Sequence, residues 1–110
     1  MKHLTDTLTI SATRILDLAQ QVAAELGEWQ FHRDLVVSVN NRHCGAPLVY
    51  VSLSTSADQA ARREFIDAFA GAMDAPVSPL PCRAGGWLMS VTVHDYDRSG
   101  VTVAASVQVA

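Results

Sequence analysis

The sequence is short of charged residues. They make up 17% of the 110-residue chain, whereas apolar residues make up 49%; charged residues average about 25% in soluble domains. This balance excludes an intrinsically disordered chain and a coiled coil. Eight basic and eleven acidic residues give a net charge of −3, which argues against general binding to nucleic acid or to an anionic membrane.

Cysteines and long apolar runs are also scarce. Cys44 and Cys82 are the two cysteines, too few for a disulfide framework, so we expect free thiols, with a single bridge between them left open. No apolar run approaches the roughly 20 residues of a membrane span, and polar residues interrupt every stretch that would serve as a secretion signal. The sequence therefore predicts a soluble, cytoplasmic protein, and its length predicts a single domain over residues 1–110.

Two segments carry the apolar periodicity of amphipathic helices. The first runs from Ser11, the expected N-cap, to Leu26. The second begins with the sequence Ser-Ala-Asp-Gln at residues 56–59, which is typical of a capping box, and ends just before Pro76. Residues 1–10 fit either an arm or an extension of the first helix.

Four further segments alternate apolar and polar residues, which is typical of strands with one face on a core. They are residues 29–40, 48–54, 87–95 and 101–109. The proline-rich segment 77–86 is expected to be a loop. The order of elements predicts an α+β fold, with a four-stranded, mainly antiparallel sheet and both helices packed on one face. The order of the strands stays open, including pairing through a partner's sheet.

The two faces of the predicted sheet differ in composition. The odd-numbered strand positions are mostly apolar and should form the core with one stripe of each helix, namely Ile15, Leu18, Val22, Phe65, Ile66, Phe69 and Met73. Trp29 and Trp87 are expected to close the end of this core. The even-numbered positions carry short, hydroxyl-rich side chains, and Asp34 is the only charged residue among them.

These even-numbered positions supply the candidate interface or ligand face. Its residues are His32, Ser38, Tyr50, Ser52, Ser90, Thr92, His94, Tyr96 and Ser106. Solvated sheet faces usually carry charged side chains that resist association, and a flat face without them can pack against another surface without burying unpaired charge. Serine and threonine also suit strands that face water, so a solvated face stays an alternative, as does a platform for a small ligand.

Known catalytic and metal-binding patterns are missing from the sequence. His32, His43, Cys44, Cys82 and His94 are suitable metal ligands, but no two of them have the spacing of a zinc motif. Cys44 has basic neighbours but no orienting third group, and the acidic residues around Tyr96 are more typical of a turn. We therefore expect no catalytic residue, no metal, no cofactor and no binding to nucleic acid or membrane.

The sequence thus favours a small, non-catalytic protein-interaction module, such as an adaptor, inhibitor or regulatory subunit. We expect it to form a homodimer, or to bind another protein, through the uncharged sheet face or an edge strand. The alternative is a small-molecule or metal-binding domain that uses polar residues of the same face.

Overall fold

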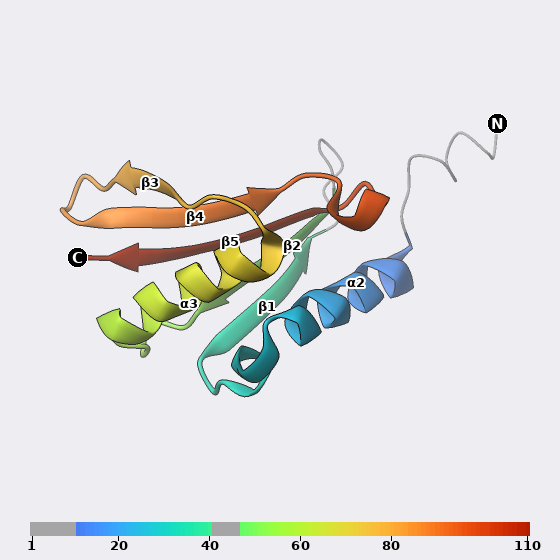
Figure 1. The fold of residues 1–110 in the computed structure, drawn as a ribbon, viewed down its shortest axis with the longest axis horizontal. Helices are drawn as coiled ribbons and strands as arrows, with labels where there is room; N and C mark the ends of the chain where they lie inside the picture. Colours follow the sequence, from blue (N-terminus) through green and yellow to red (C-terminus); the bar gives the residue numbers. More distant parts are fainter. Residues whose placement is uncertain (1–10, 41–46) are drawn as a thin grey trace.

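The computed structural model describes residues 11–40 and 47–110. Along the chain the elements are α2 (Ala12–Glu25), the 3-10 helix η1 (Gly27–Phe31), β1 (Leu35–Asn40), β2 (Leu48–Leu53), α3 (Gln59–Met73), β3 (Ser78–Pro81), β4 (Trp87–Val93), the 3-10 turn η2 (Tyr96–Arg98) and β5 (Thr102–Val109). Figure 1 shows α2 alongside β1 and α3 alongside β5. The predicted α+β class is confirmed. The segment 1–10, expected to be an arm or a helix extension, lies outside the described residues.

The sheet has five strands in the order β1-β2-β5-β4-β3, and it differs in two respects from the prediction of four mainly antiparallel strands. First, β2 and β5 are parallel neighbours, whereas the other three pairs are antiparallel. Alternation of apolar and polar residues fixes which face a side chain takes but not which strand lies next to it. A parallel pair needs a long crossover, and here α3, β3 and β4 supply it.

Second, part of the expected loop forms an additional edge strand. Residues 78–81 pair antiparallel with β4, with Ser78 opposite Ser90 and Pro81 opposite Trp87. Pro79 and Pro81 have no N–H for a second neighbour, which is tolerated because β3 lies at the edge of the sheet. The prolines of this segment led to the prediction of a loop. They are compatible with a strand here because β3 lies at the edge of the sheet.

Both helices begin at a side-chain cap. The hydroxyl of Ser11 accepts from the backbone N–H of Arg14 at 3.2 Å, as predicted. Helix α3 starts later than the predicted capping box, because Asp58 is the N-cap and accepts from the N–H of Ala61 at 2.8 Å. Ser56, the expected cap, instead donates to Asp34, and this bond anchors the segment before α3 to the start of β1.

The core lies between the sheet and the two helices. Its largest fully buried side chains are Phe65, Phe69, Ile15, Leu18, Val22, Val49, Val51, Val91, Val101 and Val103. The odd-numbered residues of β2 and β5 are buried as expected, and the even-numbered residues of β2 are half-buried on the opposite face. The apolar stripes of both helices are buried, and Met73 packs against the core while only partly covered.

The predicted core is too large at the ends of the sheet. Residues 27–31 form a 3-10 helix rather than the start of a strand, and this leaves Phe31 83% exposed and Trp29 half-buried against Phe65. Val37 on the edge strand β1 is 38% exposed, because an edge strand has a neighbour on one side only. Trp87, at the start of β4, is 46% exposed instead of closing the core.

Candidate functional site: the outer face of the sheet

Strand register gathers the uncharged even-numbered residues on one face of the sheet. Ser90 on β4 lies opposite Ser106 on β5, and Tyr50 on β2 lies opposite Ser38 on β1. Residues directly opposite each other point to the same side. We call this side the outer face, and it comprises Val36, Ser38, Asn40, Leu48, Tyr50, Ser52, Thr102, Ala104, Ser106, Gln108, Leu88, Ser90, Thr92, Ser78 and Leu80.

The outer face carries no charged side chain, and the described helices pack on the other side of the sheet. Its hydroxyl groups bond largely within the sheet. Tyr50 and Ser106 share a hydrogen bond between their hydroxyls, and Ser52 donates to the carbonyl of Ser106 at 2.7 Å. Ser90 donates to the carbonyl of Ser78 at 3.3 Å. Because these groups already have partners, covering them leaves few polar atoms unsatisfied.

Six of the residues singled out from the sequence share this outer face, namely Ser38, Tyr50, Ser52, Ser90, Thr92 and Ser106. The other three, His32, His94 and Tyr96, lie elsewhere. His94 follows the last residue of β4 and is exposed at the turn. The chain leaves the strand here, and Asp95 and Asp97 both take a left-handed conformation, so strand alternation no longer applies.

Tyr96 lies on the helix side of the molecule. Only 7% of it is exposed, and its hydroxyl donates to Glu25 of α2 at 2.7 Å. Burial, and then the hydrogen bond and charge of Glu25, raise the pKa of Tyr96 to about 12. Asp95 shapes the same turn, since its carboxylate accepts from the N–H of Gly100 at 2.7 Å. These contacts give Tyr96 and Asp95 structural roles.

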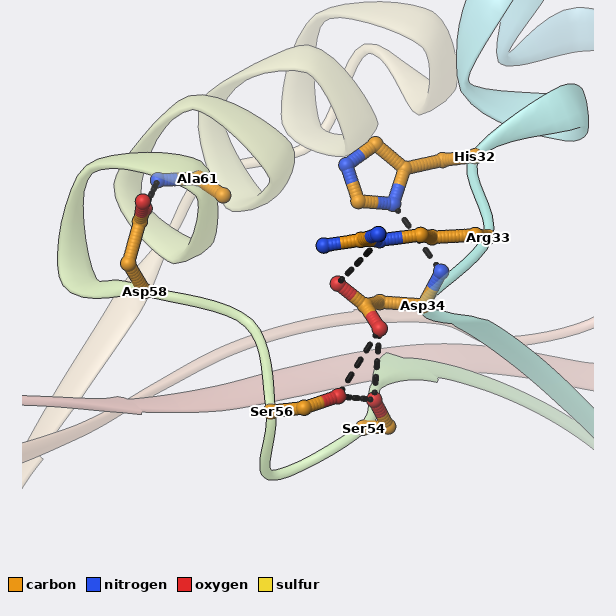
Figure 2. A network of polar contacts seen from close by, with 7 residues as sticks. All are labelled: His32, Arg33, Asp34, Ser54, Ser56, Asp58 and Ala61. Atoms are coloured by element: carbon orange, nitrogen blue, oxygen red, sulfur yellow. Dashed lines mark hydrogen bonds and ion pairs between the residues drawn. The ribbon is translucent and has the colours of Figure 1, made fainter.

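His32 belongs to a polar network at the start of β1 (Figure 2). Its Nδ1 accepts from the N–H of Asp34 at 3.1 Å, and its ring stacks on Trp29 with centroids 5.0 Å apart. The Asp34 carboxylate accepts from the hydroxyls of Ser56 at 2.9 Å and Ser54 at 3.1 Å. The Ser56 bond is the largest effect on the Asp34 pKa and lowers it, burial opposes this, and the Ser54 bond lowers it further.

This network fastens the segment before α3 to the first strand. Asp34 precedes β1, and its side chain is 13% exposed. The Asp34 carboxylate is the one charge expected among the even-numbered strand positions. It already has two hydroxyl partners, Ser54 and Ser56. The sequence signal for this contact is the pair Ser54 and Ser56, which the sequence pattern assigns to the end of a strand and to a helix cap.

Strands β2 and β5 part at one end of the outer face, and a hollow lies there. They pair only between residues 48–51 and 102–105, although β2 continues to Leu53 and β5 to Val109. The hollow measures about 230 Å³, and its lining consists of Tyr50, Ser52, Leu53, Thr55, Arg62, Leu88, Ser106, Val107 and Gln108. Arg62 is the residue that sequence reasoning missed, because it does not belong to the apolar stripe by which the buried side of this helix was predicted.

Among the metal-ligand types singled out from the sequence, His32, Cys82 and His94 lie in the described part of the chain. Within residues 11–40 and 47–110, no group of three histidine, cysteine, aspartate or glutamate residues is arranged to hold a metal ion. His43 and Cys44 lie outside the described residues. Over the same ranges, no helix is long and apolar enough to cross a membrane.

Comparison of the chain with protein-family models, curated proteins and solved structures finds no match.

Proposed function

We propose that this protein is a small interaction module that forms a homodimer through its outer face. The observation that carries the proposal is the continuity of this face across all five strands without a charged side chain. Charged residues, lysine above all, are the usual means by which exposed sheets resist association, and this sheet face has none.

A second copy of the same chain is the partner that best suits such a face. In a two-fold symmetric dimer each residue of the patch meets residues of the same patch. The strand residues of the patch then bring no like-charge pair and no unpaired ion into the contact, either of which would cost several kcal/mol. Arg62, which lines the hollow at one end of the face, belongs to α3 and is not one of them. A strongly charged partner would find no complementary charge on the outer face itself.

A lysine substitution on the β4 part of the face tests the proposal. Thr92 is exposed on β4 opposite Ala104, and Thr92→Lys would place an ammonium group within the contact. We expect light scattering to show loss of the dimer while circular dichroism keeps the wild-type helix content. Ala72→Lys, at an exposed position of α3, is the matched control and should leave the dimer intact.

Two results would contradict the proposal. A dimer that Thr92→Lys leaves unchanged would place the contact on an edge strand or a helix. A wild-type protein that stays monomeric would leave the face solvated, and Thr92→Lys should then change the unfolding free energy by no more than about 0.5 kcal/mol.

A further inference from the structure

The hollow between β2 and β5 is open because the backbone ladder between these strands stops early. The last paired residues are Val51 and Ala105. Beyond them, side chains replace the ladder: Ser52 donates to the carbonyl of Ser106 at 2.7 Å. The carbonyl of Gln108, two residues further along β5, accepts from the guanidinium of Arg62. Polar groups therefore line the hollow at the point where backbone hydrogen bonds between β2 and β5 are missing.

Arg62 reaches this hollow from α3 and is held there by backbone carbonyls. Its Nη1 donates to the carbonyl of Gln108 at 3.0 Å, and its Nη2 donates to the carbonyl of Thr55 at 3.2 Å. Within residues 11–40 and 47–110, the one ion pair is between Arg33 and Asp34, so no described carboxylate neutralises Arg62. The guanidinium is thus fixed in position while its charge has no counterion in the described part of the chain.

The described lining of the hollow offers further hydrogen-bond donors and no competing acid. A guanidinium has five N–H groups, and the two contacts of Arg62 leave others free to bind a ligand. The hydroxyls of Tyr50 and Ser106 use one hydrogen between them, so the second can be donated elsewhere. None of the described residues that line the hollow is acidic, and the side chain of Leu88 adds an apolar wall.

We propose that this hollow binds the carboxylate of a small organic acid, with Arg62 as its counterion and Leu88 against its apolar part. A planar guanidinium matches a carboxylate in both charge and hydrogen-bond geometry. At about 230 Å³ the hollow is smaller than the roughly 300–1,000 Å³ of pockets for drug-sized ligands, so the acid is small. The hollow and the outer face share Tyr50, Leu88 and Ser106, so the acid competes with a second copy of the chain for this surface. Benzoate should therefore bind Thr92→Lys at least as tightly as it binds the wild-type protein.

Binding of benzoate, compared with its neutral analogue benzamide, tests the proposal. NMR titrations of the wild-type protein at constant ionic strength should show benzoate shifting the amide signals of Tyr50, Ser106 and Gln108. Benzamide should bind at least about tenfold more weakly. A hydrogen bond to a charged group contributes more to affinity than a hydrogen bond between neutral groups, by about this factor. Equal affinity for the two compounds, or shifts confined to other residues, would overturn the proposal without any substitution.

Substitution of Arg62 provides the second arm. We expect Arg62→Gln to weaken benzoate binding by about tenfold or more, and Arg62→Lys to weaken it less. Arg63→Gln is the matched control, because Arg63 donates to the carbonyl of Ala110 and does not line the hollow. Benzoate affinity that survives Arg62→Gln, or falls equally with Arg63→Gln, would contradict the assignment of Arg62.

A blocked peptide identifies the source of the carboxylate. Gly-Glu-Gly, acetylated at its N-terminus and amidated at its C-terminus, presents the same group on a side chain. Weaker binding of this peptide than of benzoate supports a free small acid, whereas tighter binding overturns that assignment in favour of an acidic residue of another protein.

Discussion

Tyr96 donates its hydroxyl hydrogen to Glu25 at 2.7 Å, joining two residues that lie 71 positions apart in the sequence. The bond ties the turn between β4 and β5 to helix α2. Gln21, one helical turn before Glu25, donates to the same hydroxyl at 3.2 Å. The aromatic ring belongs to the buried core and lies past the end of β4 that is opposite to Trp87.

The Tyr96 contact predicts a loss of stability at high pH. The pKa of Tyr96 is raised from 10.0 to about 12 in the fold, so its contribution is fully present below pH 10.0 and is lost as pH rises through 12. Urea unfolding measured across this window should show a decline that Tyr96→Phe reduces. Tyr96→Phe should itself cost about 1 kcal/mol at neutral pH. An alkaline decline unchanged by Tyr96→Phe, but removed by Tyr50→Phe, would contradict this assignment.

The Asp34 network predicts a loss of stability at low pH. Because the hydroxyl bonds lower the Asp34 pKa below 3.8, the stabilising contribution is present above pH 3.8 and is lost as pH falls through the lower folded value. Asp34→Asn and Ser56→Ala should therefore narrow the difference in unfolding free energy between about pH 6 and about pH 3. Asp67→Asn, at an exposed position of α3, is the control for removal of one carboxylate. An equal effect of the control would refute the role of the network.

Two phenylalanines in opposite environments test the core. Phe69 is fully buried, and Phe69→Ala should lower the unfolding free energy by about 3–5 kcal/mol. Phe31 is 83% exposed on the 3-10 helix, and Phe31→Ala should change it by no more than about 0.5 kcal/mol. Chemical denaturation of both variants provides the comparison. Similar losses for the two would mean that Phe31 packs inward, as in the strand predicted for residues 29–40.

Adjacent glycines in the turn between β3 and β4 test the backbone there. Gly85 and Gly86 both have positive φ, at +99° and +77°. A Cβ on Gly85 would meet open space, whereas one on Gly86 would clash with the carbonyl oxygen of Val109. Gly86→Ala should therefore destabilise the fold by roughly 1 kcal/mol more than Gly85→Ala. Thermal melts of the two variants measure this difference, and the reverse ranking would disprove the close approach to β5.

Local patterns in the sequence were sufficient for the helices and for the side that most strand residues take. Ser11 caps α2 as expected, and Val49, Val51 and Val103 face the helices because a strand alternates strictly. The alternation of residues 29–33 was misleading, since Gly27 at φ +62° leads into a 3-10 helix instead.

The candidate site was only partly predictable, because part of it depends on which strands are neighbours. The outer face follows from alternation alone, so Ser90 and Ser106 could be assigned to it without knowing which strands are neighbours. The hollow depends on the parallel pairing of β2 with β5 and on the point where it ends. Nothing in the helical pattern around Arg62 indicates that its guanidinium reaches two carbonyls on other segments.

Sedimentation equilibrium of the wild-type protein over a range of concentrations tests the outer-face dimer most directly. The chain has a mass of 11.8 kDa. We expect the measured mass to approach twice this value as concentration rises, and to fall back to one chain in Thr92→Lys under the same conditions. A mass of 11.8 kDa maintained up to about 1 mM, where even a binding free energy of about −4.1 kcal/mol would produce dimer, would contradict self-association through this face.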